Sequence, residues 1–196
     1  MPEPKTAKGG FVHFDANAQL GPAVAFQFNP ETLERTIIPV DPSGQRREMM
    51  RFAIEFDATD ALEKGDATAG AFGIYPALAA LEALTQTTKD AGGSMPNPAA
   101  GGPGGAKPFT LFVWGSQRVF PIKFMQLEVS ETMFDGKLNP LRATVTVSLE
   151  LLNDAELNAN TSARAFMDSY LGQKKWLAGQ PGASGPTEEM LTALKK

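Results

Sequence analysis

The chain contains no cysteine and only one histidine, His13. The absence of thiols excludes disulfides, thiolate catalysis and cysteine-ligated zinc or iron–sulfur sites. A single imidazole excludes a His-rich metal site and any mechanism that needs several histidines. We therefore expect neither a metal nor a cofactor.

Long apolar runs and an excess of positive charge are also missing. Residues 1–10 lack the apolar core of a secretory signal, and the most apolar stretch, residues 71–84, is too short to span a bilayer. The net charge of −4 disfavours nucleic acid, which binds basic surfaces. We expect a soluble protein made in the bacterial cytoplasm without a signal peptide, with no membrane insertion and no nucleic-acid partner.

The composition nevertheless supports a folded core. Of 196 residues, 42% are hydrophobic, enough for one globular domain. The pattern divides the chain into a flexible segment over residues 1–20, a β domain over 21–152 and a C-terminal helical extension over 153–196. The Gly/Pro-rich stretch 91–107 has few side chains to bury, so we expect a flexible loop inside the β domain.

Alternation of apolar and polar side chains predicts about six strands. They cover residues 24–28, 33–40, 50–56, 109–114, 119–129 and 143–151. Within 119–129 the apolar side chains change parity near Phe124, which predicts a β-bulge. Asn29-Pro30 and Asn139-Pro140 mark turns.

Helical spacing replaces alternation in two places. Residues 76–86 predict a helix inserted between the third and fourth strands, and residues 163–171 predict a second, capped within 160–162 and ended by Gly172. The fold class is mainly β (α+β): an antiparallel barrel or sandwich with one flanking helix and C-terminal helices. The apolar face of the second helix either packs on its own domain or docks a partner; it consists of Phe166, Met167, Tyr170 and Leu171.

Nothing in the sequence resembles a catalytic site. His13 lies in a short strand-like stretch, residues 11–14, beside Asp15. The pair allows an acid–base interpretation, but an ordinary surface histidine is the interpretation we adopt. Glu55 and Asp57 fall on the outward side of a strand, where solvation explains them. The glycines at 101–105 lack the context of a phosphate-binding loop, and Gly-x-Ser-x-Gly is absent. We expect a protein that is not an enzyme.

Four segments resemble, in order and spacing, the tube-protein-like domain of contractile injection systems, which are phage-tail-like particles. They are residues 24–31 (VAFQFNPE), residues 50–57, residues 112–115 (FVWG) and residues 133–145 (MFDGKLNPLRATV). The resemblance covers residues 20–152. The motif residues are Phe28, Asn29, Pro30, Trp114, Gly115, Asn139, Pro140 and Arg142.

This resemblance implies a β-barrel or sandwich subunit that assembles as a six-fold ring and has a structural role. The most similar proteins look like baseplate components that join the central spike or hub to the inner tube and initiate tube assembly. The implied partners are further copies of this chain, the spike or hub, the inner tube protein and other baseplate proteins. Many such proteins carry a C-terminal LysM domain, but residues 153–196 lack its motif and are too few, which argues against peptidoglycan binding.

In a tube-like ring the outward face of the sheet would line a wet lumen. The candidate lumen-facing residues are Arg51, Glu55, Thr144, Thr146, Ser148 and Glu150. Two alternatives remain open: an inner tube or terminator (cap) protein of the same particle, and a small-ligand-binding β-barrel or enzyme with inward polar groups such as Gln126. The particle itself is either intracellular or released.

Overall fold

The computed structural model describes residues 7–40, 46–86 and 107–180. Within them, seven strands form one antiparallel sheet in the order β2-β1-β5-β6-β7-β4-β3. The strands are β1 Gly10–Phe14, β2 Leu20–Ala25, β3 Glu34–Ile38, β4 Arg47–Asp57, β5 Phe109–Trp114, β6 Arg118–Phe134 and β7 Pro140–Leu151. The helices are α1 Thr59–Glu63, α2 Ala67–Phe72, α3 Tyr75–Gln86, α4 Asp154–Asn158 and α5 Thr161–Ala178. The mainly β, α+β class is confirmed.

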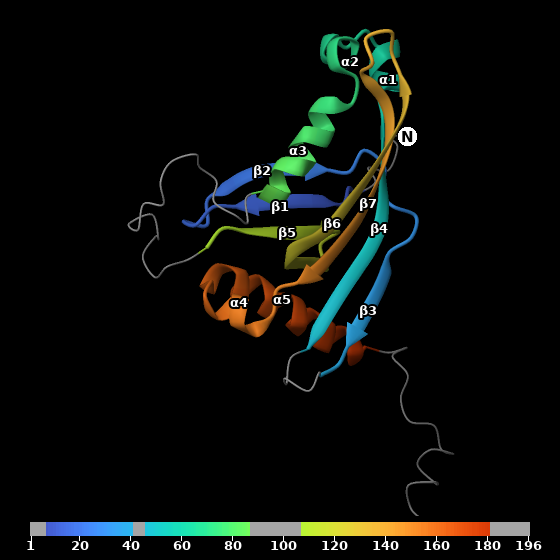
Figure 1. Cartoon of the computed structure of the whole chain (residues 1–196). Coiled ribbons are helices and arrows are strands. Elements are labelled where there is room, and N and C mark those ends of the chain that lie inside the picture. Colours follow the sequence, from blue (N-terminus) through green and yellow to red (C-terminus); the bar gives the residue numbers. More distant parts are fainter. Residues whose placement is uncertain (1–6, 41–45, 87–106, 181–196) are drawn as a thin grey trace, which may run out of the picture.

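The sheet is strongly bent. Figure 1 shows β1, β2 and β5 crossing the view while β3, β4 and β7 run up and down. The long strand β6 belongs to both halves, because it pairs with β5 through residues 118–122 and with β7 through residues 122–134. A register shift between Phe124 and Gln126 marks a bulge in β6, which confirms the change of parity in the sequence.

One face of the sheet is packed with aromatic side chains. The ring centroid of Phe11 lies 5.3 Å from that of Phe26 and 4.9 Å from that of Phe124. Phe52 of β4 lies 5.8 Å from Phe26 and 5.4 Å from Phe112 of β5. Since β4 and β5 are separated in the sheet by β6 and β7, these contacts require the sheet to curl around the core.

The expected barrel or sandwich is only partly confirmed: the antiparallel sheet curls, but it does not close into a barrel, because among the described residues it stays open between β2 and β3. Near this gap the Gln27 side chain replaces a strand ladder: its Nε2 donates to the Asp57 carbonyl at 2.7 Å, and its Oε1 accepts from the Asp57 N–H at 2.9 Å. β2 and β3 stand at the two ends of the strand order and do not pair with each other within the described part of the chain.

The seventh strand, β1, is the one missing from the expected six. It lies inside residues 1–20, which the sequence assigned to a flexible segment, and it pairs with both β2 and β5. The expected loop 91–107 lies outside the described residues except for Lys107. The insertion between β4 and β5 contains α1 and α2 as well as the expected α3.

Helices α3 and α5 pack against the sheet. Leu78, Leu81 and Leu84 of α3 are buried, and α3 lies across β1 and β2 in Figure 1. Helix α5 begins at an Asn160 cap, whose Oδ1 accepts from the Ala163 N–H at 2.9 Å. It does not end at Gly172, which lies exposed within the helix at a cost of about 1 kcal/mol relative to Ala.

The register of β7 makes a direct prediction. Val147 is fully buried between Phe52 and Leu127, whereas the next residue, Ser148, lies on the opposite face beside Arg51. Val147→Asp should cost more than about 4 kcal/mol and largely prevent folding, because it buries an unpaired charge. Ser148→Asp should stay within about 1 kcal/mol of the parent in urea denaturation. Equal stability of the two variants would show that this register is wrong.

Candidate functional site

The face of the sheet opposite the core is polar along β4, β6 and β7. Arg51, Glu55 and Thr144 are exposed, and Thr146 and Ser148 are half-buried. Arg51 reaches across β7, with its Nη2 3.3 Å from Oε2 of Glu128 on β6. We call this the outer face, and five of the six residues expected on it lie there in contact with solvent.

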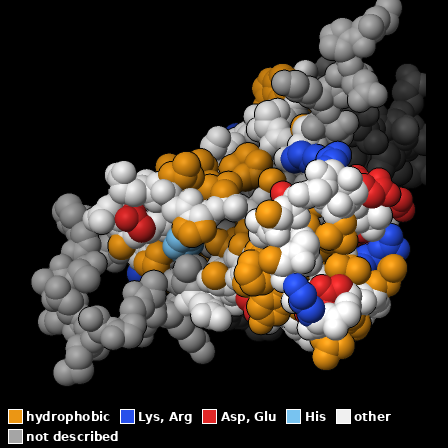
Figure 2. Space-filling model, turned by 90° about the horizontal axis from the view of Figure 1, so that it is seen from above, with side chains coloured by type: hydrophobic (Ala, Val, Ile, Leu, Met, Phe, Trp, Pro, Cys, Tyr) orange, Lys and Arg blue, Asp and Glu red, His pale blue; other side chains and the backbone are white. Residues whose placement is uncertain are grey.

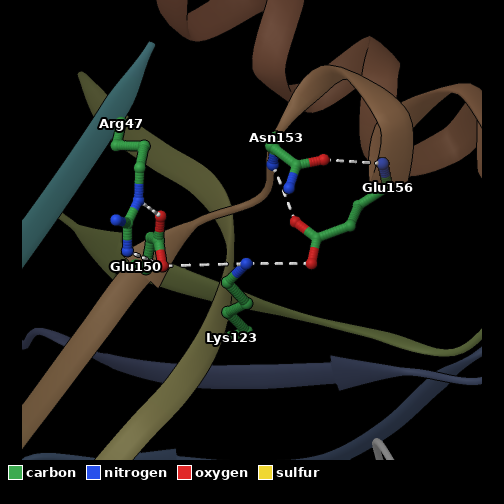
Figure 3. A network of polar contacts seen from close by, with 5 residues as sticks. All are labelled: Arg47, Lys123, Glu150, Asn153 and Glu156. Atoms are coloured by element: carbon green, nitrogen blue, oxygen red, sulfur yellow. Dashed lines mark hydrogen bonds and ion pairs between the residues drawn. The ribbon is translucent and has the colours of Figure 1, made fainter. Parts of the chain in front are cut away.

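The sixth, Glu150, corrects the prediction: its side chain is only 4% exposed. Arg47 donates to both carboxylate oxygens, over 2.7 Å from Nε and 3.2 Å from Nη2, and Lys123 Nζ lies 3.7 Å away. Lys123 also donates to Glu156 of α4 over 2.9 Å, as Figure 3 shows. Alternation placed Glu150 outward correctly, but these cations and α4 cover that end of the face.

Glu150 and α4 form one polar network (Figure 3). Asn153 caps α4 by accepting from the Glu156 N–H at 2.9 Å, and Glu156 accepts from the Asn153 N–H at 2.8 Å. Hydrogen bonding from Arg47 lowers the pKa of Glu150 despite its burial, and Lys123 adds to this effect. The carboxylate is therefore a structural ion-pair partner that fixes the start of the C-terminal extension.

The Asn139–Arg142 motif holds the helical insertion against the β6–β7 hairpin. Asn139 Nδ2 donates to the Ala71 carbonyl over 3.0 Å, and the Pro140 carbonyl accepts from the Ile74 N–H over 2.9 Å. Gly73 makes this approach possible, since a Cβ there would lie 2.1 Å from the Pro140 oxygen. Asn139 and Pro140 thus each have a partner in the segment between β4 and α3.

Arg142 completes this attachment at the end of β4. Its Nε and Nη2 each lie 2.7 Å from Oδ2 of Asp57. Hydrogen bonds from Thr59 and Arg142 lower the pKa of Asp57. The motif is therefore a joint between strand, hairpin and helices, and its residues are committed to contacts within the chain.

The Phe28–Pro30 motif follows β2 and borders the outer face. Asn29 holds the N-terminal segment, because its Oδ1 accepts from the Gly9 N–H at 2.9 Å and its Nδ2 donates to the Ala7 carbonyl at 2.8 Å. Phe28 is 47% exposed. It lines a hollow of about 370 Å³ together with Glu55, Asp57, Thr132, Arg142 and Thr144.

Trp114 and Gly115 close the third motif. Trp114 stacks parallel to Phe112, with centroids 6.1 Å apart, and covers Gly9, where a Cβ would come within 2.6 Å of the indole ring. Gly115 has φ +69° and starts the turn to β6, a conformation that favours glycine. Both residues serve the packing of the sheet.

The helix suggested for partner docking is mostly occupied by its own domain. Met167 and Tyr170 are buried, and the Tyr170 ring lies 4.5 Å from Phe120. Phe166 packs against Phe14 and Phe109. Leu171, the fourth residue of that set, remains 40% exposed.

Two buried polar groups were not expected. Glu48 is 4% exposed; Lys174 of α5 donates to it over 2.9 Å and Tyr170 over 3.3 Å, while Arg46 lies 3.4 Å away. The burial of Glu48 could have been predicted from the alternation in β4, because Glu48 lies two residues before Met50 and shares its core-facing side.

His13 is also buried rather than at the surface. Its Nδ1 lies 3.2 Å from Thr110 Oγ1. Burial lowers the pKa of His13, while Asp15 opposes that shift.

Within the described residues, no group of three or more His, Asp or Glu side chains is arranged to hold a metal ion. In the same ranges, no helix is both long and apolar enough to cross a membrane. Gln126, expected among inward polar groups, lies on the outer face, where it donates to Glu128 over 3.0 Å.

The chain matches no known protein-family model and no curated protein. Its chemistry must therefore be inferred from its own surfaces. Among the described residues those surfaces offer a polar outer face, two sheet edges without a paired strand and a β6–β7 hairpin held by the Asn139–Arg142 contacts, all of which suit protein–protein contact.

The Glu150 pair predicts an acid-sensitive contribution to stability. Because folding lowers this pKa, the stabilisation is complete above the ordinary value of 4.5 and is lost as pH falls below it. At pH 7, Glu150→Gln should lower the free energy of unfolding by about 1–3 kcal/mol in urea denaturation. The difference in unfolding free energy between variant and parent should be smaller at pH 3.5. The exposed Glu55→Gln should change stability by less than about 0.5 kcal/mol. A gap for Glu150→Gln that is independent of pH would contradict the assignment.

Proposed function

We propose that this chain is a structural baseplate subunit of a contractile injection system, forming an oligomeric ring that joins the central spike or hub to the inner tube. The observation that carries the proposal is the open sheet, whose edge strands β2 and β3 each lack a neighbour on one side among the described residues. A ring supplies that neighbour, because β3 of one copy can pair with β2 of the next. The order of motifs in the sequence supports the same assignment.

The free edges of β2 and β3 carry features that limit pairing with unrelated strands. Pro22 interrupts the donor pattern of β2, and β3 is short and carries Glu34 and Arg35. Such features limit edge-to-edge aggregation of a free subunit. We therefore expect the ring to form on a template, the spike or hub, and not readily in the isolated chain.

The outer face would give the ring a polar, hydrated lumen surface. Edge pairing leaves this face free, and it carries Arg51, Glu55 and Thr144 in contact with solvent. The Arg51–Glu128 pair balances part of its charge. A polar face of mixed charge would let cargo pass through a lumen without adhering to it.

The helices support a position at the spike end of the tube. The α1–α3 insertion and the α4–α5 extension are fixed to the sheet by the Asn139 and Glu150 contacts and add specialised surface to the β domain. An inner tube protein or a terminator of the same particle remains the alternative, and electron microscopy separates them by position. The small-ligand alternative is weaker, because the hollow beside Phe28 is bordered mainly by polar and charged side chains.

Cross-linking tests the edge pairing, since the absence of cysteine lets introduced thiols report alone. Ala23 on β2 and Thr36 on β3 are both exposed. The double variant Ala23→Cys/Thr36→Cys, treated with a short bis-maleimide in assembled particles, should give a ladder of covalent oligomers. Moving the second thiol to exposed Asp168 of α5 is the matched control and should give none. Absence of the ladder in particles that contain the variant chain would rule out pairing of β2 with β3.

A further inference from the structure

Charge is unevenly distributed along β4. At the Asp57 end, residues 57–75 and 131–142 hold six carboxylates and three cations. At the Arg47 end, residues 34–40, 46–48, 150 and 174–178 hold five cations and three carboxylates, of which Glu48 and Glu150 are buried and bonded to cations. Because β4 is a continuous strand of 11 residues, these groups lie at opposite ends of the molecule, at the top and bottom of Figure 1.

The acidic end also exposes large apolar side chains. We call this end the tip; its exposed apolar residues are Leu62, Phe72, Tyr75, Met133, Phe134 and Leu138. Figure 2 looks down on this end and shows hydrophobic side chains between charged ones. The tip is braced, because Asp135 accepts from the Lys137 and Asn139 N–H groups at 2.7 and 2.9 Å. A rigid apolar surface loses little conformational entropy when it is covered.

The basic end, which we call the base, carries its own exposed apolar set of Ile37, Val40, Trp176 and Leu177. Arg46, Lys174 and Lys175 lie near this set where β3, β4 and α5 meet, because Lys174 donates to Glu48, which pairs with Ile37. Apolar surface with net positive charge complements apolar surface with net negative charge.

We propose that a second copy of this chain docks end to end, with the tip of one copy on the base of the next. Tip-to-tip and base-to-base contacts would each oppose like charges, which disfavours a two-fold dimer. A tip-to-base contact is heterologous and leaves a free tip and a free base, so further copies can add beyond a dimer. The contact joins the two ends of the molecule that β4 connects, so it does not involve the edges of β2 and β3. It also does not depend on the proposed particle.

Sedimentation velocity of the isolated full chain tests this contact. In about 20 mM salt the mean sedimentation coefficient should rise with concentration beyond that of a dimer, and in about 1 M salt it should fall, because the Debye length shrinks to about 3 Å. Leu138→Ser at the tip and Trp176→Ser at the base should each weaken association about tenfold or more. Lys175→Glu should also weaken it.

Matched controls separate the ends from the rest of the surface. Leu20→Ser removes an equally exposed leucine from β2, and Lys107→Glu makes the same charge change away from both ends; neither should alter association. A chain that stays monomeric at every concentration and salt level overturns the proposal and leaves the tip to a different protein. A closed dimer that is sensitive to Leu138→Ser but not to Trp176→Ser also overturns it in favour of a tip-to-tip contact. Neither result bears on the cross-linking of β2 to β3 in particles.

Discussion

The bulge in β6 is the constraint on which the rest of the structure depends. Before it, Phe120 and Phe124 face the core; after it, Leu127 faces the same side because one extra residue, Met125, shifts the parity. Without that shift, Leu127 would point to the polar outer face and Gln126 to the core. The bulge lets a single strand pair with both β5 and β7 while the sheet bends, which brings the phenylalanines of distant strands together.

The bend separates the surfaces of the molecule by chemistry. The core side is filled by aromatic rings and covered by α3 and α5, the outer face keeps its polar side chains, and the sheet remains open between β2 and β3. The Asn139–Arg142 joint fixes the helical insertion to one end of this sheet, and the Arg47–Glu150–Lys123 network fixes α4 near the other.

Local patterns predicted most strands because alternation records which side of a strand is buried. The strand expected over residues 24–28 is an exception, since β2 covers Leu20–Ala25 and ends before Phe26. Residues 109–114 matched β5 in full, and the parity change near Phe124 located the bulge. The strand-like stretch over residues 11–14 was not counted among the six expected strands, because GFVHF is short and lacks clear alternation. The closed barrel was wrong because closure depends on contacts between edges, and the Gln27–Asp57 bridge that stands near the gap leaves no local pattern.

The candidate site shows the same limit. Arg51, Glu55 and Thr144 were placed outward correctly, since exposure on a strand is local information. The burial of Glu150 depends on Arg47, which is 103 residues away in the chain, and that of Glu48 depends on Lys174, 126 residues away. The structural partners of Asn139 and Arg142 likewise lie in a different segment, so the motif could be found in the sequence but its role could not.

We propose that the sheet, which is open in the single chain, is completed by a neighbouring copy in the assembly. Hydrogen exchange of the backbone amides in β2 and β3 tests it most directly, because exchange reports whether an N–H has a lasting partner. In the isolated chain, the amides of these two strands that point away from β1 and β4 should exchange rapidly, and in assembled particles the same amides should become protected. Protection already present in the isolated monomer, or rapid exchange that persists in the particle, would contradict the account.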